Sequence, residues 1–514
     1  MKRRRNLIKF MFQRVTLVTL SMLAQLAVLA MGLAYAGTAY RAVSVAISVL
    51  SWALLLYIIS GSRAWQAYKL AWAIPLLVLP VLGLLLYLFF GGRSQERVNR
   101  RKVREEDALL RGELKQDPAV LEALADSAPE ALLSARYLLH AAGFPAYRGS
   151  ETVYFSPAEA AEDALFEALE SAEHYLFLEF FIVSPGVIWD RVLSILERKA
   201  AQGVEVRLLY DDFGCIRHLP MRYSRQLAQK GIRAAAVNPY IPVLSSRLNN
   251  RDHRKMLIVD GKVAFTGGVN LSDEYFNKTA PFGHWKDSLL RIRGEAVWSM
   301  TAAFLLMWHT ATGEDCEFSR FRPAYPAPEA AIPGFVQPFA DTPRDDELVG
   351  ENVYLDLIHA ATRTLDIQTP YLVIDEALTQ ALCAAARSGV RVRIFLPGIP
   401  DKWYVHMLSR AYYGELTEAG VQICEYTPGF LHSKVFLADE KLAVVGTINL
   451  DFRSLYLHYE DAVLLAGTDS IGQIARDFRE LAGQSEPYSA ERIRATGPLR
   501  RVLQAVLRVF APLM

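Results

Sequence analysis

The stretch His253-Arg-Lys-Met-Leu-Ile-Val-Asp260 recurs later in the chain as His432-Ser-Lys-Val-Phe-Leu-Ala-Asp439. Both copies keep a histidine, a lysine two residues on, and an aspartate five residues after the lysine. A glycine and an asparagine follow at matched spacing, as Gly267 and Asn270 and as Gly446 and Asn449. One histidine–lysine pair carries no information, but five matched positions in two places are not noise at roughly one chance in twenty per position.

The segments around the two copies also match. Residues 175–179 and 364–368 are strand-like runs, and each is followed by a helix-like segment and a second strand-like run, at 203–209 and 389–395. The near-constant offsets between the copies indicate an internal duplication. Alternating strands and helices predict two α/β halves whose sheets are largely buried.

Each motif is expected on a strand, because a run of valine, leucine and isoleucine or phenylalanine follows it. Residues two apart on a strand point to the same face, so the histidine and the lysine project together. Asp260-Gly261 is a hairpin signal that returns the chain into a second strand. Gly267, Gly268 and Gly446 then allow a close approach of backbone near the site.

Phosphodiester chemistry needs a nucleophile, a proton donor for the leaving alcohol, and cations for the phosphate oxygens. Two histidines can supply the first two, because imidazole titrates near neutrality. Two lysines, helped by the asparagine amides, can hold the phosphate without a metal or another cofactor. The expected catalytic residues are His253, Lys255, Asp260, His432, Lys434 and Asp439, and the expected supporting residues are Asn270, Asn449, Asp287, Glu460, Gly267, Gly268, Gly446 and Thr447.

The carboxylates in this set have alternative interpretations. Asp260 and Asp439 lie at hairpin tips, where an aspartate is often only a turn former or a partner for a lysine. Asp287 and Glu460 lie downstream of the first and second motif histidines and are candidates to orient them. Glu179 is a further candidate, although Gln368 occupies the equivalent position of the other half.

Composition narrows the class of protein. The chain has 514 residues, enough for two or three domains, and 52% of them are hydrophobic, with the excess in about the first ninety residues. A net charge of +1 gives no global field for nucleic acid. The four cysteines contain no CxxC pair, so neither a zinc site nor a disulfide framework is expected.

Three stretches without a charged residue, 15–35, 42–60 and 70–90, each approach the roughly 20 residues that cross a bilayer as a helix. The first is longer than the core of a cleaved signal peptide, so we interpret it as a retained anchor. Pro75, Pro80 and Gly83 would allow the third to be re-entrant. Basic residues are balanced between the two sides, and we favour a multi-pass protein of the cell membrane with a cytoplasmic catalytic domain.

The expected organisation has six parts. The last is a basic amphipathic helix, which could dock on the protein itself or lie in the lipid interface. The boundaries are 1–92 for the membrane anchor with two to three spans, 93–150 for a helical juxtamembrane connector, 151–318 for the first α/β domain, 319–344 for a Pro-rich linker, 345–487 for the second α/β domain and 488–514 for the C-terminal helix.

Over residues 151–487 the paired motif resembles the phospholipase D superfamily, for which it is highly specific. Finer features resemble bacterial cardiolipin synthases: Tyr68-Lys-Leu-Ala-Trp72-x2-Pro75, the run 267–275, Trp285-Lys-Asp287 and the run 446–454. The chain departs from most such proteins in having a third apolar stretch. It also carries Thr447 where some relatives have serine, a change that keeps the hydroxyl.

The resemblance implies two duplicated α/β domains packed with pseudo-two-fold symmetry, with one composite site. It also implies phosphatidylglycerol and membrane lipid as partners, and a reaction that condenses two phosphatidylglycerol molecules into cardiolipin and glycerol through a phosphohistidine. We favour His253 as the nucleophile and His432 as the acid and base, although the near-symmetry of the motifs is compatible with the reverse. The oligomeric state stays open.

Three other functions are compatible with parts of this pattern. A hydrolytic phospholipase D would use the same residues with water as acceptor. A nucleic-acid phosphodiesterase is disfavoured by the apolar stretches and by the lack of a basic excess. A non-enzymatic lipid-binding protein is disfavoured because both motifs are intact.

Overall fold

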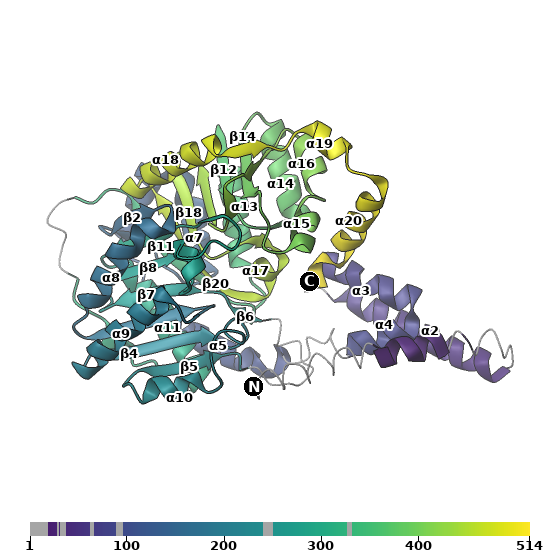
Figure 1. Ribbon diagram of the computed structural model, residues 1–514, viewed down its shortest axis with the longest axis horizontal. Coiled ribbons are helices and arrows are strands. Elements are labelled where there is room, and N and C mark those ends of the chain that lie inside the picture. Colours follow the sequence, from purple (N-terminus) through teal and green to yellow (C-terminus); the bar gives the residue numbers. More distant parts are fainter. Residues whose placement is uncertain are drawn as a thin grey trace. The chain divides into compact units, whose positions relative to one another are not determined.

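The computed structural model describes residues 19–27, 30, 38–61, 66–88, 96–239, 250–325 and 331–513 (Figure 1). It divides into two compact units. The N-terminal unit comprises residues 1–100 with 240–249 and 505–514. The second unit comprises residues 101–239 with 250–504, and we call it the catalytic unit because it contains both motifs expected to be catalytic.

The N-terminal unit contains α2 (Thr38–Ser60), α3 (Gln66–Val78) and α4 (Pro80–Leu86). Within α2, Arg41–Ser60 has a mean hydropathy of 2.3 and is, among the described residues, the one helix long and apolar enough to cross a membrane. The expected second span is therefore a helix. Most of the expected first span, 15–35, lies outside the described residues.

The expected third span is two short helices. Pro75 lies inside α3, and the apolar part of that helix, Tyr68–Val78, is shorter than a bilayer requires. A Cβ on Gly83 of α4 would lie 2.6 Å from the backbone oxygen of Pro75, so α4 packs tightly against α3. Trp72 contacts Tyr87 edge-on at a centroid distance of 5.1 Å. The broken form of this stretch, which Pro75, Pro80 and Gly83 allowed, is the one found over the described residues, because the helix is interrupted at Leu79, before Pro80.

The first half of the catalytic unit is built on a seven-stranded sheet of order β2-β10-β8-β7-β3-β4-β5. Strands β3, β4 and β5 are parallel, and β3, β7, β8, β10 and β2 pair antiparallel in turn. All six residues of β3 are buried, as expected for a strand covered on both faces. The bounds are β2 Glu151–Phe155, β3 Tyr175–Phe180, β4 Glu205–Asp211, β5 Arg233–Val237, β7 Lys255–Val259, β8 Val263–Gly267, β10 Leu289–Arg293, α8 Glu162–Glu170, α9 Val187–Ala201, α10 Tyr223–Ala228 and α11 Val297–Thr312.

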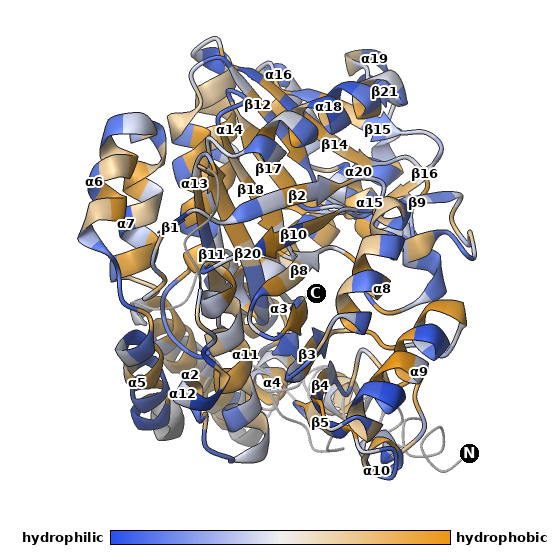
Figure 2. Cartoon of the chain, turned by 90° about the vertical axis from the view of Figure 1, so that its left-hand side faces the viewer, coloured by the Kyte–Doolittle hydropathy of each residue, from blue (hydrophilic) through white to orange (hydrophobic). Residues whose placement is uncertain are grey.

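The second half repeats this arrangement in the sheet β1-β11-β20-β18-β17-β12-β14-β15-β21. Its strands β20, β18, β17, β12, β14 and β15 correspond in order and direction to β10, β8, β7, β3, β4 and β5. Figure 2 shows β14, β17 and β18 coloured largely as apolar. The bounds are β1 Tyr147–Arg148, β11 Phe335–Asp341, β12 Thr364–Gln368, β14 Arg391–Pro397, β15 Gln422–Tyr426, β17 Val435–Ala438, β18 Leu442–Gly446, β20 His458–Ala466, β21 Ser485–Pro487, α13 Val349–Ala360, α14 Glu376–Arg387 and α18 Asp469–Gly483.

The expected connector is helical, with α5 (Glu96–Glu113), α6 (Pro118–Ser127) and α7 (Leu132–His140). The expected Pro-rich linker at 319–344 is only partly irregular. Strand β11 lies inside 319–344 and pairs with β20, so this part of the stretch belongs to the second sheet. The prediction of a linker from proline content is wrong for this part of the stretch, because Pro338 fits within the strand, opposite Val463.

Two short strand pairs join the halves reciprocally. β6 (Arg251–Asp252), just before His253, pairs in parallel with the start of β20. β16 (Gly429–Leu431), just before His432, pairs in parallel with β9 (His284–Lys286). Each motif histidine is thus delivered to a strand of the opposite half, which brings both motifs to one place.

Candidate active site

The two motif histidines are fixed through their backbones by the opposite half. The N–H of His253 donates to the carbonyl oxygen of Tyr459 at 2.9 Å, and that of His432 donates to the carbonyl oxygen of Lys286 at 2.8 Å. Both side chains are largely buried, with 7% of each residue exposed. The register of the two strand pairs therefore sets the position of each imidazole.

Each imidazole is oriented by a carboxylate from the other half. His253 Nδ1 lies 2.9 Å from Glu460 Oε2, and His432 Nδ1 lies 2.8 Å from Asp287 Oδ2. Asp287 and Glu460 were expected to serve the histidine upstream in their own half, and that pairing is wrong. A carboxylate on Nδ1 fixes the tautomer and leaves Nε2 as the reactive nitrogen.

The two carboxylates are held by different means. Thr447 Oγ1 donates to Glu460 Oε2 at 2.5 Å, whereas Asp287 Oδ1 accepts from the N–H of Ser288 at 2.8 Å. A Cβ on Gly268, the counterpart of Thr447, would lie 2.0 Å from Asp287 Oδ1. Only glycine leaves room for this carboxylate.

The other two motif glycines also admit a neighbouring strand. Gly267 has a φ of 153°, and a Cβ there would lie 2.2 Å from the carbonyl oxygen of Ser288. A Cβ on Gly446 would lie 2.4 Å from the carbonyl oxygen of Asp461. The close backbone approach expected at the glycines is therefore made to the residues that directly follow the two carboxylates, Ser288 and Asp461.

Replacing Thr447 by valine should lower kcat about 10- to 100-fold, because it removes a hydrogen bond from a buried carboxylate and lets Glu460 shift against His253. Thr447→Ser keeps the hydroxyl and should stay within about threefold of the wild type. Steady-state turnover measures both variants. Equal loss in the serine and valine variants would show that packing, not the hydrogen bond, matters at this position.

The motif lysines are buried beside the imidazoles. Lys255 Nζ donates to the carbonyl oxygen of His253 at 2.6 Å, and Lys434 Nζ lies 3.1 Å from His432 Nε2. Burial lowers the pKa of Lys255 to about 8 and that of Lys434 to about 7, although Glu460 and Asp287 attract both charges. A bound anion would therefore stabilise the charged form of both lysines, because it compensates for the water that burial removes.

In the empty site the imidazoles are neutral and the carboxylates are ionised. Burial lowers the pKa of His253 to about 3 and that of His432 to about 4, and it outweighs the opposing carboxylates. Burial alone would raise the pKa of Glu460 and of Asp287, but the neighbouring imidazoles lower both. An entering phosphodiester brings a negative charge, which favours protonation of one imidazole.

The motif asparagines differ in their surroundings. Asn270 Oδ1 accepts from the N–H of Ile182 at 3.0 Å, and its Nδ2 donates to the Tyr275 hydroxyl at 2.8 Å. Its amide therefore braces the site rather than facing it freely. Asn449 is buried, and its Oδ1 has no hydrogen-bond partner in the described part of the chain.

The motif aspartates take a supporting position. Asp260 accepts the backbone N–H groups of residues 173–175 at 2.7–2.9 Å, and Asp439 accepts those of residues 362–364 at 2.7–2.8 Å. Each lies at the end of its strand away from the histidine, about 16 Å along β7 for five residues at roughly 3.3 Å per residue. These contacts favour a structural role for the two aspartates at the turns over a direct role in catalysis. Neither carboxylate pairs with a motif lysine among the described contacts.

Two ring-bearing side chains beside the motif histidines were not among the expected site residues. His458 lies 5.4 Å from His253, and Trp285 lies 5.4 Å from His432, between ring centroids. Each precedes an orienting carboxylate by two residues, so aligning Trp285-x-Asp287 with His458-x-Glu460 could have found them. The site is thus nearly symmetric, with an imidazole on one side where the other has an indole.

Among the described residues, one group of side chains has metal-ligand chemistry. His253, His458 and Glu460 place donor atoms within 4.8 Å of one another. Two of these three side chains, His253 and Glu460, are already hydrogen-bonded to each other. We assign no ion to the group.

Comparison with known proteins agrees with this geometry. The model described as "Cardiolipin synthase, PLD-like domain" matches residues 165–293 and 354–482, and "Phospholipase_D-nuclease N-terminal" matches residues 49–92. A cardiolipin synthase of Geobacillus thermodenitrificans is 37% identical over 89% of this chain and 91% of its own. An uncharacterized protein of Streptococcus mutans is 39% identical over 87% of this chain and 96% of its own.

Among solved structures, a phosphatidylserine synthase of Haemophilus influenzae superposes with a TM-score of 0.53. It is 15% identical and covers 71% of this chain and 93% of its own, so the likeness concerns the fold alone.

Two phospholipase D-like domains that share one pair of carboxylate-oriented histidines define a phospholipase D-like enzyme. The family model that matches both halves and the sequence identity to curated cardiolipin synthases identify a particular family within that class. The chain belongs to the cardiolipin synthase family and is a phospholipid phosphatidyltransferase.

Proposed function

We propose that the protein is a cardiolipin synthase, which transfers the phosphatidyl group of one phosphatidylglycerol to a glycerol hydroxyl of another. The products are cardiolipin and glycerol. The observation that carries the proposal is the crossed pairing of His253 with Glu460 and of His432 with Asp287. It gives one site two equally equipped imidazoles, as a two-step transfer requires.

In the first step His253 Nε2 attacks the phosphorus of the donor lipid. A P–N bond forms, the bond from phosphorus to the glycerol oxygen breaks, and protonated His432 gives its proton to the departing glycerol. Lys255 and Lys434 stabilise the negative charge on the phosphate oxygens. Burial lowers the pKa of His253, which suits an imidazole that must stay unprotonated.

In the second step His432, now neutral, takes the proton of the acceptor's glycerol hydroxyl. The hydroxyl oxygen attacks phosphorus, the P–N bond breaks, and His253 returns to its neutral form. His432 regains the proton that it gave away, so the cycle closes without a cofactor. Asp287 stabilises the imidazolium of His432 in both steps.

The rate should fall with rising pH. Phosphate binding needs charged lysines, and their pKa values in the free enzyme are about 7 and about 8. Because kcat/KM reports the free enzyme, it should fall steadily as pH rises above about 4, where His432 loses its proton, and more steeply as the lysines lose their charge at pH 7 to 8. Arginine stays charged throughout, so Lys434→Arg should move the decline toward the higher pKa of Lys255. An unchanged profile would show that Lys434 does not bind as a cation.

Lipid analysis of cells tests the reaction itself. The protein is expressed in a host without cardiolipin, and total lipids are measured by mass spectrometry. Cardiolipin appearing with a matching release of glycerol supports transfer. Phosphatidic acid appearing in its place would mean that water is the acceptor, and no lipid change in membranes that contain the protein would refute action on phosphatidylglycerol.

We also propose that the N-terminal part anchors the enzyme as a multi-pass segment of the cell membrane, with the catalytic unit, including the domains at 151–318 and 345–487, on the cytoplasmic side. The apolar helix at Arg41–Ser60 supports membrane attachment. A fluorescent protein fused after residue 514 should mature and emit. Emission lost there, with an active periplasmic reporter instead, would reverse the orientation.

A further inference from the structure

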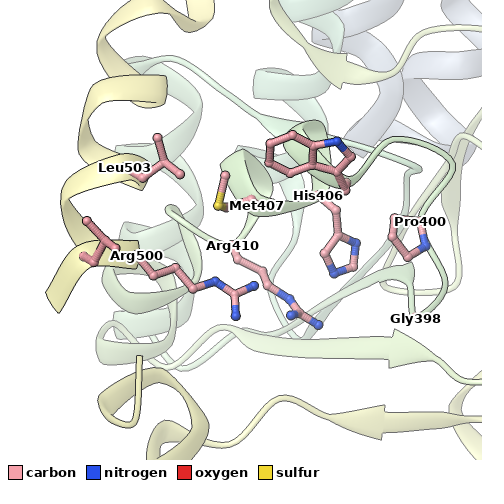
Figure 3. A pocket seen from close by; sticks show the side chains of 9 residues that line it. Gly398, Pro400, His406, Met407, Arg410, Arg500 and Leu503 are labelled. Carbon is pink, nitrogen blue, oxygen red and sulfur yellow. The ribbon is translucent and has the colours of Figure 1, made fainter. Parts of the chain in front are cut away.

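A groove of about 600 Å³ opens in the second half of the catalytic unit. It lies between α15 (Trp403–Ser409), the turn after β14, and the start of α20 (Pro498–Phe510), and we call it the α15–α20 groove (Figure 3). No lining residue is acidic. The groove is separate from the two motif histidines, which are absent from its lining.

Large apolar side chains stand exposed around the groove. Trp403 is 69% exposed and Leu499 is 82% exposed, and Leu503 also faces solvent. Helix α20 has no buried residue, although its sequence is strongly amphipathic. Clustered apolar exposure of this kind marks a surface that is covered in use.

Two arginines from different elements line the same groove. In Figure 3 the side chain of Arg500 runs from α20 toward that of Arg410. Arg410 already bonds Glu425 at 2.8 and 2.9 Å, whereas Arg500 has no ion pair among the described residues. Burial and these two charges lower the pKa of His406 to about 4, so His406 is neutral near pH 7 and the groove's charge comes from the arginines.

Two segments that line the groove connect to other parts of the enzyme. The N–H of Ile399, in the turn beside it, bonds the carbonyl oxygen of Gly429 in β16, the strand that leads into His432. Helix α20 carries Leu499 and Arg500 in the groove, and its last residues, from Ala505 on, belong to the N-terminal unit.

We propose that the α15–α20 groove holds the phosphate and glycerol backbone of a bilayer phospholipid, so that this face of the catalytic unit rests on the membrane surface. Arg500 binds the phosphate with its guanidinium fork, assisted by Arg410. Trp403 and the leucines of α20 enter the boundary between headgroups and acyl chains, where amphipathic helices and tryptophans are stable. The inference deepens the proposed function, because it places the enzyme's lipid-facing side.

Trp403 provides the readout. The full chain carrying His432→Gln, which stops turnover, is placed in nanodiscs of phosphatidylglycerol with brominated or unbrominated acyl chains. Bromine quenches tryptophan by contact, and subtracting the Trp403→Phe signal isolates Trp403 from the other tryptophans. We expect bromine to remove at least about half of the Trp403 emission, as for a ring at the headgroup boundary. Arg500→Gln should weaken the quenching, since one arginine near an anionic surface changes binding about fivefold.

Arg391→Gln is the matched control, because Arg391 is exposed at the opposite end of β14, and it should change nothing. Trp403 emission that bromine leaves unchanged but aqueous acrylamide quenches would overturn the proposal, since the face would be in water. Emission protected from both quenchers would overturn it in favour of a second copy of the chain. Equal quenching in the Arg500 and Arg391 variants would refute the phosphate contact. None of these results depends on which lipid reaction the enzyme catalyses.

Discussion

Alanine at His253 or at His432 will lower cardiolipin formation by about 10³- to 10⁴-fold or more, since each substitution removes a nucleophile or the proton-transfer group of both steps. The two single variants and the double variant should be about equally inactive, because the residues act as one unit. Cardiolipin formed from labelled phosphatidylglycerol by purified protein in detergent is the measurement.

His359→Ala is the control for this experiment, because His359 is an exposed histidine of α13 outside the site, and it should keep wild-type activity. A His253 or His432 variant that stays within about tenfold of the wild type would contradict the two-histidine mechanism.

Removing the charge of an orienting carboxylate should have the second-largest effect. Glu460→Gln and Asp287→Asn are each expected to lower kcat by about 10²- to 10⁴-fold with little change in KM, because each touches an imidazole rather than the lipid. Asp469→Asn, an exposed aspartate at the start of α18, is the matched control.

The crossed pairing gives these two variants distinct signatures. Carbethoxylation of each histidine, followed by mass spectrometry, reports how nucleophilic its Nε2 is. Glu460→Gln should slow modification of His253 and spare His432, and Asp287→Asn should do the reverse. The opposite pattern would mean that each carboxylate serves its own half.

Local pattern was enough to locate the candidate site. The duplicated motif, the strand periodicity and the α/β halves follow from residue spacing, which a single sequence displays directly. The orienting carboxylates Asp287 and Glu460 were also found. Their partners were assigned wrongly, because pairing depends on β6 with β20 and on β9 with β16. Strands of two and three residues leave no periodicity to detect.

The motif aspartates show a second limit. Asp260 and Asp439 share the spacing of the catalytic residues, and spacing does not distinguish a residue that acts from one that holds the strand. Five residues of extended strand span about 16 Å, so the aspartate of each motif lies far from the lysine of the same motif. The role of Thr447 was likewise invisible, since its partner Glu460 becomes a neighbour only through the β18–β20 pairing.

The central claim is that the phosphatidyl group passes through a histidine of the composite site. Purified enzyme is mixed with labelled phosphatidylglycerol, quenched in alkali because the P–N bond is acid-labile, digested and analysed by mass spectrometry. We predict a phosphatidyl adduct on the peptide that contains His253, formed fast enough to precede cardiolipin and absent in His253→Ala. Cardiolipin formed at the normal rate with no histidine adduct, or with an adduct on His432 alone, would contradict the account.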